Sequence, residues 1–291
     1  MAQRSFPVLV ATDGSPQSRA AMEAAVAFPW PRGSSGHGVV ARATPVLTDA
    51  APAVWDALLE VSRAEARRAE QRLRRRWPDA EVFVTELPPV PGILARARKV
   101  RARVLVLGSR GLGAVGRLLL GSVSRACVRQ ARSSVLVVRG SARAPRRFLI
   151  GVDGSPHARA AIAFVAGLAL PRGGSVRLLS VVEPVRPPST GLLPARVRAM
   201  VASEAASLEQ EHVARAQRQL EAARERLTRA GWRVKTDVQL GRAVEELLRA
   251  AADADVLVVG ARGVGTVERI VVGSVAEGVV SRAPVPVLVV R

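Results

Sequence analysis

Short apolar runs alternate along this chain with segments in which apolar residues recur at helical spacing, and the same order is followed twice. Runs rich in valine and leucine, without regular polar alternation, are typical of strands buried on both faces of a parallel sheet. In the first half the predicted strands are Phe6–Ala11, Gly38–Thr44, Glu81–Glu86, Val104–Leu107 and Ser134–Arg139. In the second half strands are predicted from Phe148 onward and over Ser175–Val182, Arg233–Leu240, Val256–Val259 and Val285–Val290.

Helices are predicted between these strands. Asp-Gly-Ser-Pro follows the first strand of each half, which predicts Ser15 as an N-cap, Pro16 as the first helical residue and a helix over Gln17–Phe28. Long amphipathic helices are expected between the second and third strands, and shorter helices after the third and fourth. Their predicted ranges are Ala53–Arg76, Leu193–Arg229, Ile93–Lys99 and Val244–Ala251, with further helices beginning at Ser122 and Ser274.

The two halves repeat one another closely enough to indicate a duplication. Asp13-Gly14-Ser15-Pro16 returns as Asp153-Gly154-Ser155-Pro156, and both are followed by Arg-Ala-Ala at the same spacing. Strands alternating with helices predict an α/β fold made of two tandem doubly wound (Rossmann-like) domains, each a five-stranded parallel sheet with helices on both faces. The predicted domains are residues 1–140 and 148–291, joined by a short polar linker over 141–147.

A glycine-bearing loop after the fourth strand is also repeated. Val104–Ser124 and Val256–Ala276 share their glycine spacing, which gives Gly108, Gly111 and Gly121-Ser122 in one half and Gly260, Gly263 and Gly273-Ser274 in the other. Glycines let backbone N–H groups approach an anion, and a helix that begins at the serine adds the positive end of its dipole. This combination suits a phosphate group.

An aspartate follows the first strand in each half, Asp13 and Asp153. Ligands of open α/β sheets bind beyond the carboxyl ends of the strands, where the strand order reverses. If strands one and four are neighbours, the carboxylate and the glycine loop face one crevice, and a ribose hydroxyl donating to the carboxylate would complete a nucleotide site. Two alternatives remain open here: the aspartates as turn or capping carboxylates, and the serines as simple N-caps.

Both halves resemble the universal stress protein domain, and specifically its ATP-binding branch. That family's signature is Gly, two residues, Gly, nine residues, Gly, then Ser or Thr, as it stands twice in this chain. The resemblance implies a regulatory stress-response module that binds ATP or another adenine nucleotide, alone or with Mg²⁺. It also implies that the fifth strands, Ser134–Arg139 and Val285–Val290, pair within one molecule. A homodimer of the whole chain stays open.

The resemblance also assigns roles to residues. The aspartate holds the ribose, the glycine loop and hydroxyl hold the phosphates, and a residue near the end of strand two flanks the adenine. The implied nucleotide-binding residues of the first half are Ala11, Thr12, Asp13, Ala43, Leu107, Gly108, Arg110, Gly111, Gly121, Ser122, Val123 and Ser124. Those of the second half are Gly151, Val152, Asp153, Val181, Val259, Gly260, Arg262, Gly263, Gly273, Ser274, Val275 and Ala276.

The alternative function is that of an enzyme, a slow ATPase or a nucleotidyl transferase that uses the same sites. The glycine loop is not followed by the Gly-Lys-Ser/Thr of a P-loop, so the lysine that reaches the outer phosphates is missing. The sequence offers no paired carboxylates, no metal cluster and no nucleophile beside a histidine. Binding is therefore favoured over catalysis, with no catalytic residue and no metal ligand assigned.

Composition bears on three further possibilities: nucleic-acid binding, membrane association and cysteine chemistry. The net charge of +20 suggests polyanion affinity, but the arginines are scattered over every predicted helix and there is no tyrosine for base stacking, so no specific nucleic-acid partner is expected. The longest apolar runs are too short to cross a bilayer, and the N-terminus has no secretory pattern, which predicts a cytoplasmic protein without a membrane partner. The single cysteine, Cys127, is predicted to be a packing residue.

Overall fold

The protein is described by a computed structural model that covers residues 5–41, 52–111, 120–140, 143–185, 194–263 and 272–291. Ten strands of the described residues form one sheet in the order β3-β2-β1-β4-β5-β10-β9-β6-β7-β8. Every neighbouring pair is parallel except β5 and β10, which meet antiparallel at the centre. The predicted α/β class and the two tandem doubly wound domains are confirmed, and their two five-stranded sheets are continuous through the pairing of β5 with β10.

The first half contains five strands and four helices in strict alternation. Its strands are β1 (Phe6–Thr12), β2 (Ser34–Val40), β3 (Glu81–Val84), β4 (Val104–Gly108) and β5 (Ser134–Val138). Its helices are α1 (Pro16–Ala27), α2 (Pro52–Arg74), α3 (Pro89–Lys99) and α4 (Ser122–Gln130). The strand order reverses at β1, which has β2 on one side and β4 on the other.

The second half repeats this plan. Its strands are β6 (Arg147–Gly151), β7 (Ser175–Val182), β8 (Arg233–Leu240), β9 (Val256–Gly260) and β10 (Val287–Val290). Its helices are α5 (Pro156–Ala166), α6 (Ala195–Arg229), α7 (Ala243–Ala251) and α8 (Ser274–Arg282). Here the order reverses at β6, which lies between β7 and β9.

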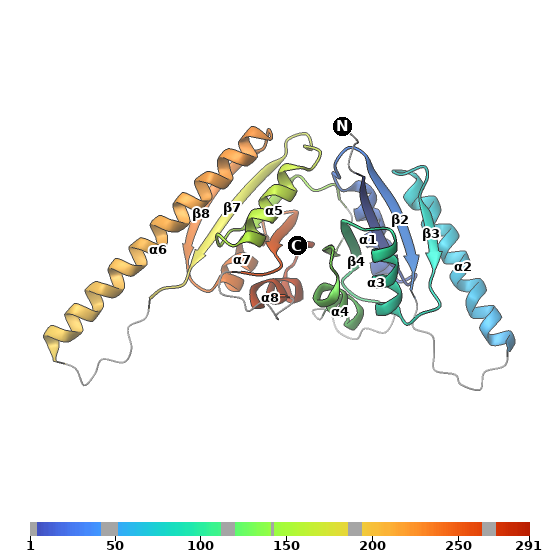
Figure 1. Cartoon of the computed structure of the whole chain (residues 1–291), viewed down its shortest axis with the longest axis horizontal. Coiled ribbons are helices and arrows are strands. Elements are labelled where there is room, and N and C mark those ends of the chain that lie inside the picture. Colours follow the sequence, from blue (N-terminus) through green and yellow to red (C-terminus); the bar gives the residue numbers. More distant parts are fainter. Residues whose placement is uncertain (1–4, 42–51, 112–119, 141–142, 186–193, 264–271) are drawn as a thin grey trace.

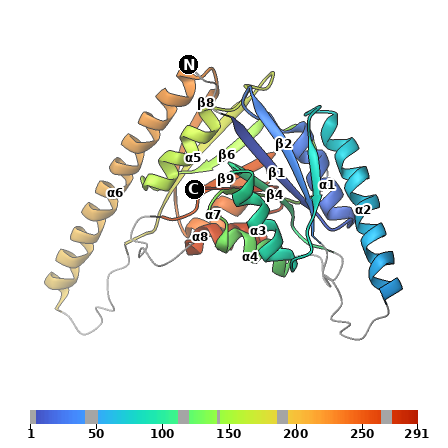
Figure 2. The ribbon, with the colours of Figure 1, turned by 45° about the vertical axis from the view of Figure 1, so that its right-hand side comes forward.

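The helices form two layers, one on each face of the sheet. Helices α1, α2, α5 and α6 pack with one buried cluster of side chains, and α3, α4, α7 and α8 with the other. Both clusters contain residues of both halves, so each layer of the core continues from one half into the other. The long helices α2 and α6 lie at the two outer flanks of the molecule (Figures 1 and 2).

The joint between the halves is built from backbone and aromatic contacts. Strand β5 pairs with β10 in the register Val137 to Val287, and all residues of both strands are buried. On the α1 face, ring contacts join the halves: Phe28 meets Phe148 edge to face with the ring centroids 6.1 Å apart. Burial of large aromatic side chains at this point stabilises the halves against each other.

The helix starts at Ser15 and Ser155 are as the sequence predicts, whereas the second strand has different bounds. Ser15 and Ser155 are N-caps whose side chains accept from the backbone N–H three residues on, followed by proline, which confirms the prediction for Ser15 and Pro16. The predicted second strand, Gly38–Thr44, is wrong in its bounds, since β2 spans Ser34–Val40. Gly36 and Gly38 of β2 are buried under the side chains of Trp77 and Val82, and this tertiary contact is not reported by local propensity.

Candidate functional site

The candidate site of each half lies where two neighbouring strands end. Asp13 directly follows β1, and the glycine loop directly follows the adjacent β4. The Oδ1 atom of Asp13 accepts a hydrogen bond of 3.0 Å from the backbone N–H of Ser15, and Asp153 makes the same contact with Ser155 at 2.9 Å. Each aspartate therefore accepts a hydrogen bond within its turn, which agrees with the turn-carboxylate alternative, and it also lies next to the glycine loop.

The second carboxylate oxygen of each aspartate faces the second glycine of the loop. A Cβ built on Gly111 would overlap Oδ2 of Asp13, and one built on Gly263 would lie 2.7 Å from Oδ2 of Asp153. Only a glycine permits this approach of a carboxylate to the loop backbone. Both halves therefore bring together the aspartate and the loop that the sequence placed about 100 residues apart.

The first glycine of the loop has a different role, because it lets the strand end pack against a helix backbone. A Cβ on Gly108 would lie 2.8 Å from the carbonyl carbon and oxygen of Gln17 at the start of α1. In the second half the Cβ of Gly260 would lie 2.7 Å from the carbonyl carbon of His157. Any side chain at either position would therefore collide with the start of the neighbouring helix.

The third glycine begins the helix that follows the loop. Gly121 and Gly273 are the N-caps of α4 and α8, and their N–H groups donate to the carbonyls of Ser109 and Ala261, each at 2.8 Å. The reading of Ser122 and Ser274 as N-caps is therefore wrong: both are first helical residues, and both are exposed. An exposed hydroxyl beside unpaired N–H groups of a first helical turn is suited to an anion.

The remaining sequence-predicted residues fall into two groups. Ala11, Thr12, Leu107, Val152 and Val259 are buried at the ends of their strands or directly after them. Val123, Val275 and Gly151 are partly buried. Ser124 is buried and donates to the carbonyl of Gly108 at 2.6 Å, so its hydroxyl ties α4 to β4, whereas Ala276 stands at this place in the second half.

The adenine-flanking positions are only partly covered. Val181 lies in β7 and is partly buried, while Ala43 lies outside the described residues, as do residues 112–119 and 264–271 between the glycines. Strand register makes Ala41 the counterpart of Val181, because Val10 pairs with Gly38 and Ile150 with Leu178. Sequence comparison of the halves misses this equivalence because the second strands differ in composition.

A buried polar network behind Asp13 was not predicted. Thr12 lies within hydrogen-bonding distance of Ser18 (3.0 Å) and donates to the buried carboxylate of Glu65 (3.3 Å), and its hydroxyl accepts from the N–H of Gly14. The second half has Val152 and Ala158 instead, and Gln219 lies against Gly154. A sequence signal did exist: Glu65 interrupts the apolar stripe of α2 formed by Ala66, Ala69 and Leu73.

Two arginine pairs flank the sites. Arg139, just after β5, donates to the carbonyls of Val280 and Ser281 in the last turn of α8, at 2.7 and 2.8 Å. Burial, and next the charge of Arg110, lower the pKa of Arg139. Arg291 occupies the equivalent position in the second half and donates to the carbonyl of Val128 in α4 of the first half. Burial, and next the charge of Arg262, lower the pKa of Arg291.

Two other titratable groups lie close to the loops. Burial, then Arg262 and Arg291, lower the pKa of His157, against the smaller opposite effect of Asp153. Cys127 is fully buried in α4, and burial raises the pKa of its thiol to about 12, which agrees with packing rather than redox chemistry.

Fold and site together define a tandem α/β protein in which an aspartate and a glycine loop meet at each point of strand reversal. The universal stress protein family model matches residues 6–139 and 145–291, so the chain belongs to the universal stress protein family, whose proteins act in the stress response. No helix among the described residues has the length and apolarity to cross a membrane.

Relatives agree with this assignment. A universal stress protein of Mycobacterium tuberculosis is 35% identical over 222 residues, which cover 70% of this chain and 66% of that protein. One of Mycolicibacterium smegmatis is 33% identical over 207 residues, covering 65% and 62%. The chain thus spans slightly less than two thirds of these relatives. The crystal structure of a universal stress protein from Archaeoglobus fulgidus superposes with a TM-score of 0.62 over 98% of this chain and 96% of that chain, at 20% identity, and shows the shared fold.

Proposed function

We propose that the chain is a cytoplasmic regulatory module of the stress response that binds one adenine nucleotide, ATP, in each half. One observation carries the proposal: the carboxylates of Asp13 and Asp153 lie directly against Gly111 and Gly263 of the loops. A carboxylate accepts hydrogen bonds from vicinal ribose hydroxyls, and the loop backbone with the α4 or α8 N-terminus binds phosphates. These two kinds of group lie side by side, as they do along a nucleotide.

Binding is a better description than catalysis. In the described part of the chain no three His, Cys, Asp or Glu side chains gather where they could hold a metal ion. We therefore assign Mg²⁺ to the phosphates of the nucleotide rather than to a protein cluster. Neither loop sequence contains a lysine, so the group that reaches the outer phosphates in a P-loop is missing, which favours a signal-holding role over turnover.

Calorimetric titration of the full chain with ATP tests the proposal. We expect two equivalents for the original chain, one after Asp13→Asn or Asp153→Asn, and none for the double variant. Asparagine keeps the Oδ1 acceptor for the turn N–H, so the fold is retained while the charge is lost. Asp79→Asn, at an exposed turn position, is the matched control and should keep two equivalents.

The same proteins distinguish ATP from other adenine nucleotides and binding from slow hydrolysis. Titrations with AMP and cyclic AMP show whether the outer phosphates are needed, and ADP formation during long incubation measures slow ATPase activity. Absence of both heat and thermal stabilisation with every nucleotide would show that the loops are only turns.

A further inference from the structure

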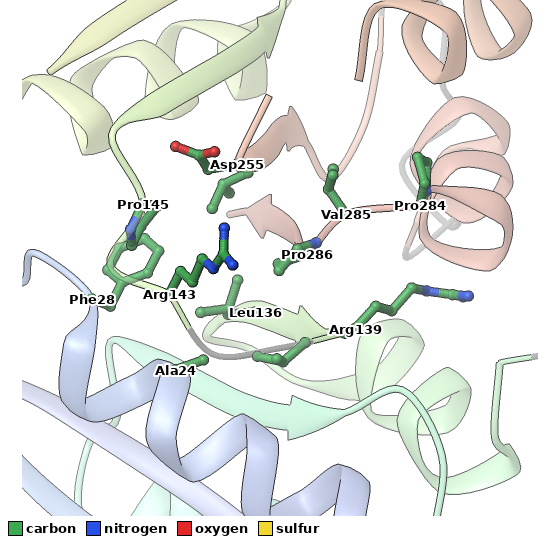
Figure 3. A pocket seen from close by; sticks show the side chains of 13 residues that line it. Ala24, Phe28, Leu136, Arg139, Arg143, Pro145, Asp255, Pro284, Val285 and Pro286 are labelled. Carbon is green, nitrogen blue, oxygen red and sulfur yellow. The ribbon is translucent and has the colours of Figure 1, made fainter. Parts of the chain in front are cut away.

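A groove between the two halves borders the first candidate nucleotide site at Arg110 but is formed mainly by other residues. One part is a cavity of about 280 Å³ whose apolar wall includes Ala24 and Phe28 of α1, Leu136 of β5 and Val256. Figure 3 shows Phe28 and Ala24 on one side of this cavity, and Val285 and Pro286 on the other. The apolar part of the groove is thus formed by both halves.

The groove continues into a second, cationic part. This cavity, of about 480 Å³, is lined by the first turns of α1, by Arg110 and Arg139, and by Arg282 at the end of α8. The two cavities share Val138, Arg139, Gly140 and Pro284 in their walls. Figure 3 shows Arg143 extending into the apolar part, while Arg139 extends toward Pro284. Together the volumes fall in the range of sites for small molecules.

Charge in the groove is strongly one-sided. Four arginines line it, Arg110, Arg139, Arg143 and Arg282, against a single carboxylate, that of Asp255. Asp255 is already engaged, because it accepts from the N–H groups of Arg146 and Arg147 at 2.8 Å and from the Arg147 guanidinium at 2.8 and 3.1 Å. It therefore contributes little to the neutralisation of the lining arginines.

Three of these arginines form no ion pair with the residues that the structure describes. Among the described residues, Arg139, Arg143 and Arg282 take part in no ion pair, and no acceptor lies within hydrogen-bonding distance of the buried Nε atom of Arg139. Guanidinium groups placed close together in a partly buried cavity repel each other, which an anion between them would relieve.

We propose that this interdomain groove binds a small organic anion, with a phosphate or carboxylate head at Arg139 and Arg282 and an apolar body against Ala24 and Phe28. Helix α1, which lines both parts of the groove, lies on one face of the sheet, and α4, whose N-terminus belongs to the first candidate nucleotide site, lies on the other. The cationic part also reaches Arg282 of α8 on the α4 side. Among the described residues assigned to a nucleotide site, Arg110 alone also lines the groove. The groove is thus a second kind of site, and its test does not depend on nucleotide binding.

The dye anilinonaphthalene sulfonate has the required anionic head and aromatic body, and its fluorescence rises on binding to an apolar cavity. We expect the full chain to bind it saturably, and the Asp13→Asn/Asp153→Asn chain to bind it equally. Arg143→Gln and Arg282→Gln, both at exposed positions, should each weaken binding by about fivefold, the effect of one partly screened charged hydrogen bond. Ala24→Phe, which fills the apolar part, should weaken it by at least tenfold.

Two controls separate this site from general dye adhesion. Arg98→Gln, on the exposed surface of α3, removes the same charge elsewhere and should leave binding unchanged. Phenylnaphthylamine, which has the rings but no sulfonate, should bind at least tenfold more weakly. Equal affinities of the Arg282→Gln and Arg98→Gln chains would overturn the proposal, as would displacement of the dye by neither phenyl phosphate nor benzoate. Displacement by only one of them identifies the preferred head group.

Discussion

The carboxylate of Asp13 lies so close to the α-carbon of Gly111 that no other side chain fits between them. The same relationship holds for Asp153 and Gly263 in the second half. It joins the end of β1 to the loop after β4 across a gap in sequence of nearly 100 residues. The geometry of the candidate nucleotide site therefore depends on a contact that a single methyl group can disturb.

Alanine substitutions at Gly111 and Gly108 should have different effects, the first on ATP affinity and the second on the free energy of unfolding. In Gly111→Ala the new methyl meets the mobile end of Asp13, so we expect stability within about 1 kcal/mol but about tenfold weaker ATP binding in the first half. In Gly108→Ala the methyl meets the backbone of Gln17, so unfolding should be easier by about 2–4 kcal/mol. Gly167→Ala, whose Cβ has ordinary contacts at 3.5 Å, is the neutral control. Urea denaturation and calorimetry measure both effects, and the reverse order of effects would contradict this assignment.

The network of Thr12 and Glu65 should show a non-additive response. Thr12→Val removes the donor to the buried carboxylate and should destabilise the protein by about 1–2 kcal/mol. The double variant Thr12→Val/Glu65→Gln approaches the arrangement of the second half and should regain part of this loss, since a neutral amide costs less to bury. Urea denaturation of both variants and of Glu65→Gln completes the cycle. Strictly additive losses would show that the hydroxyl and the carboxylate are not coupled.

Stability should fall below pH 6.5 because of two histidines. Burial, and next Arg96, lower the pKa of His37, and burial with Arg262 and Arg291 lowers that of His157, both from the ordinary value of 6.5. Above pH 6.5 both histidines are neutral in the folded and unfolded chain. Below it the unfolded chain takes up protons first, so the fold loses stability until the lowered pKa is reached.

This pH effect has a simple test. Melting temperatures between pH 7.5 and 5.5 should fall less steeply in His157→Gln, by about 1–3 °C over the range, as expected for a half-exposed group. His212→Gln, at an exposed position of α6, should follow the original chain. Identical slopes for all three proteins would contradict the contribution of His157.

The joint between β5 and β10 predicts the behaviour of a shortened chain that ends at Gly140. Its strand β5 would become an unpaired edge whose residues are all buried in the full chain. Such an edge pairs readily with a copy of itself, so light scattering should give twice the monomer mass. Val135→Lys in the shortened chain should prevent the pairing. A stable monomer of the unsubstituted shortened chain would show that β10 is dispensable.

Much of the candidate site followed from sequence because its parts are local. Gly108, Gly111 and Gly121 occur within one loop, and Ser15 caps the helix that it begins, so spacing and turn chemistry identify them. The register of β2 did not follow, since it depends on how Gly36 and Gly38 fit under side chains from later elements. By register Ala41 is the counterpart of Val181, while the predicted Ala43 lies outside the described residues.

The sequence by itself determined the alternation of strands and helices, the duplication, and the pairing of an aspartate with a glycine loop, because each depends on residues close together or on direct repetition. Only the tertiary structure shows the groove between the halves and the hydrogen-bond partners of Glu65 and Arg139. Glu65 meets Thr12, and Arg139 meets α8, across 53 and more than 140 residues. Contacts of this length depend on how whole layers pack, and no local pattern encodes that packing.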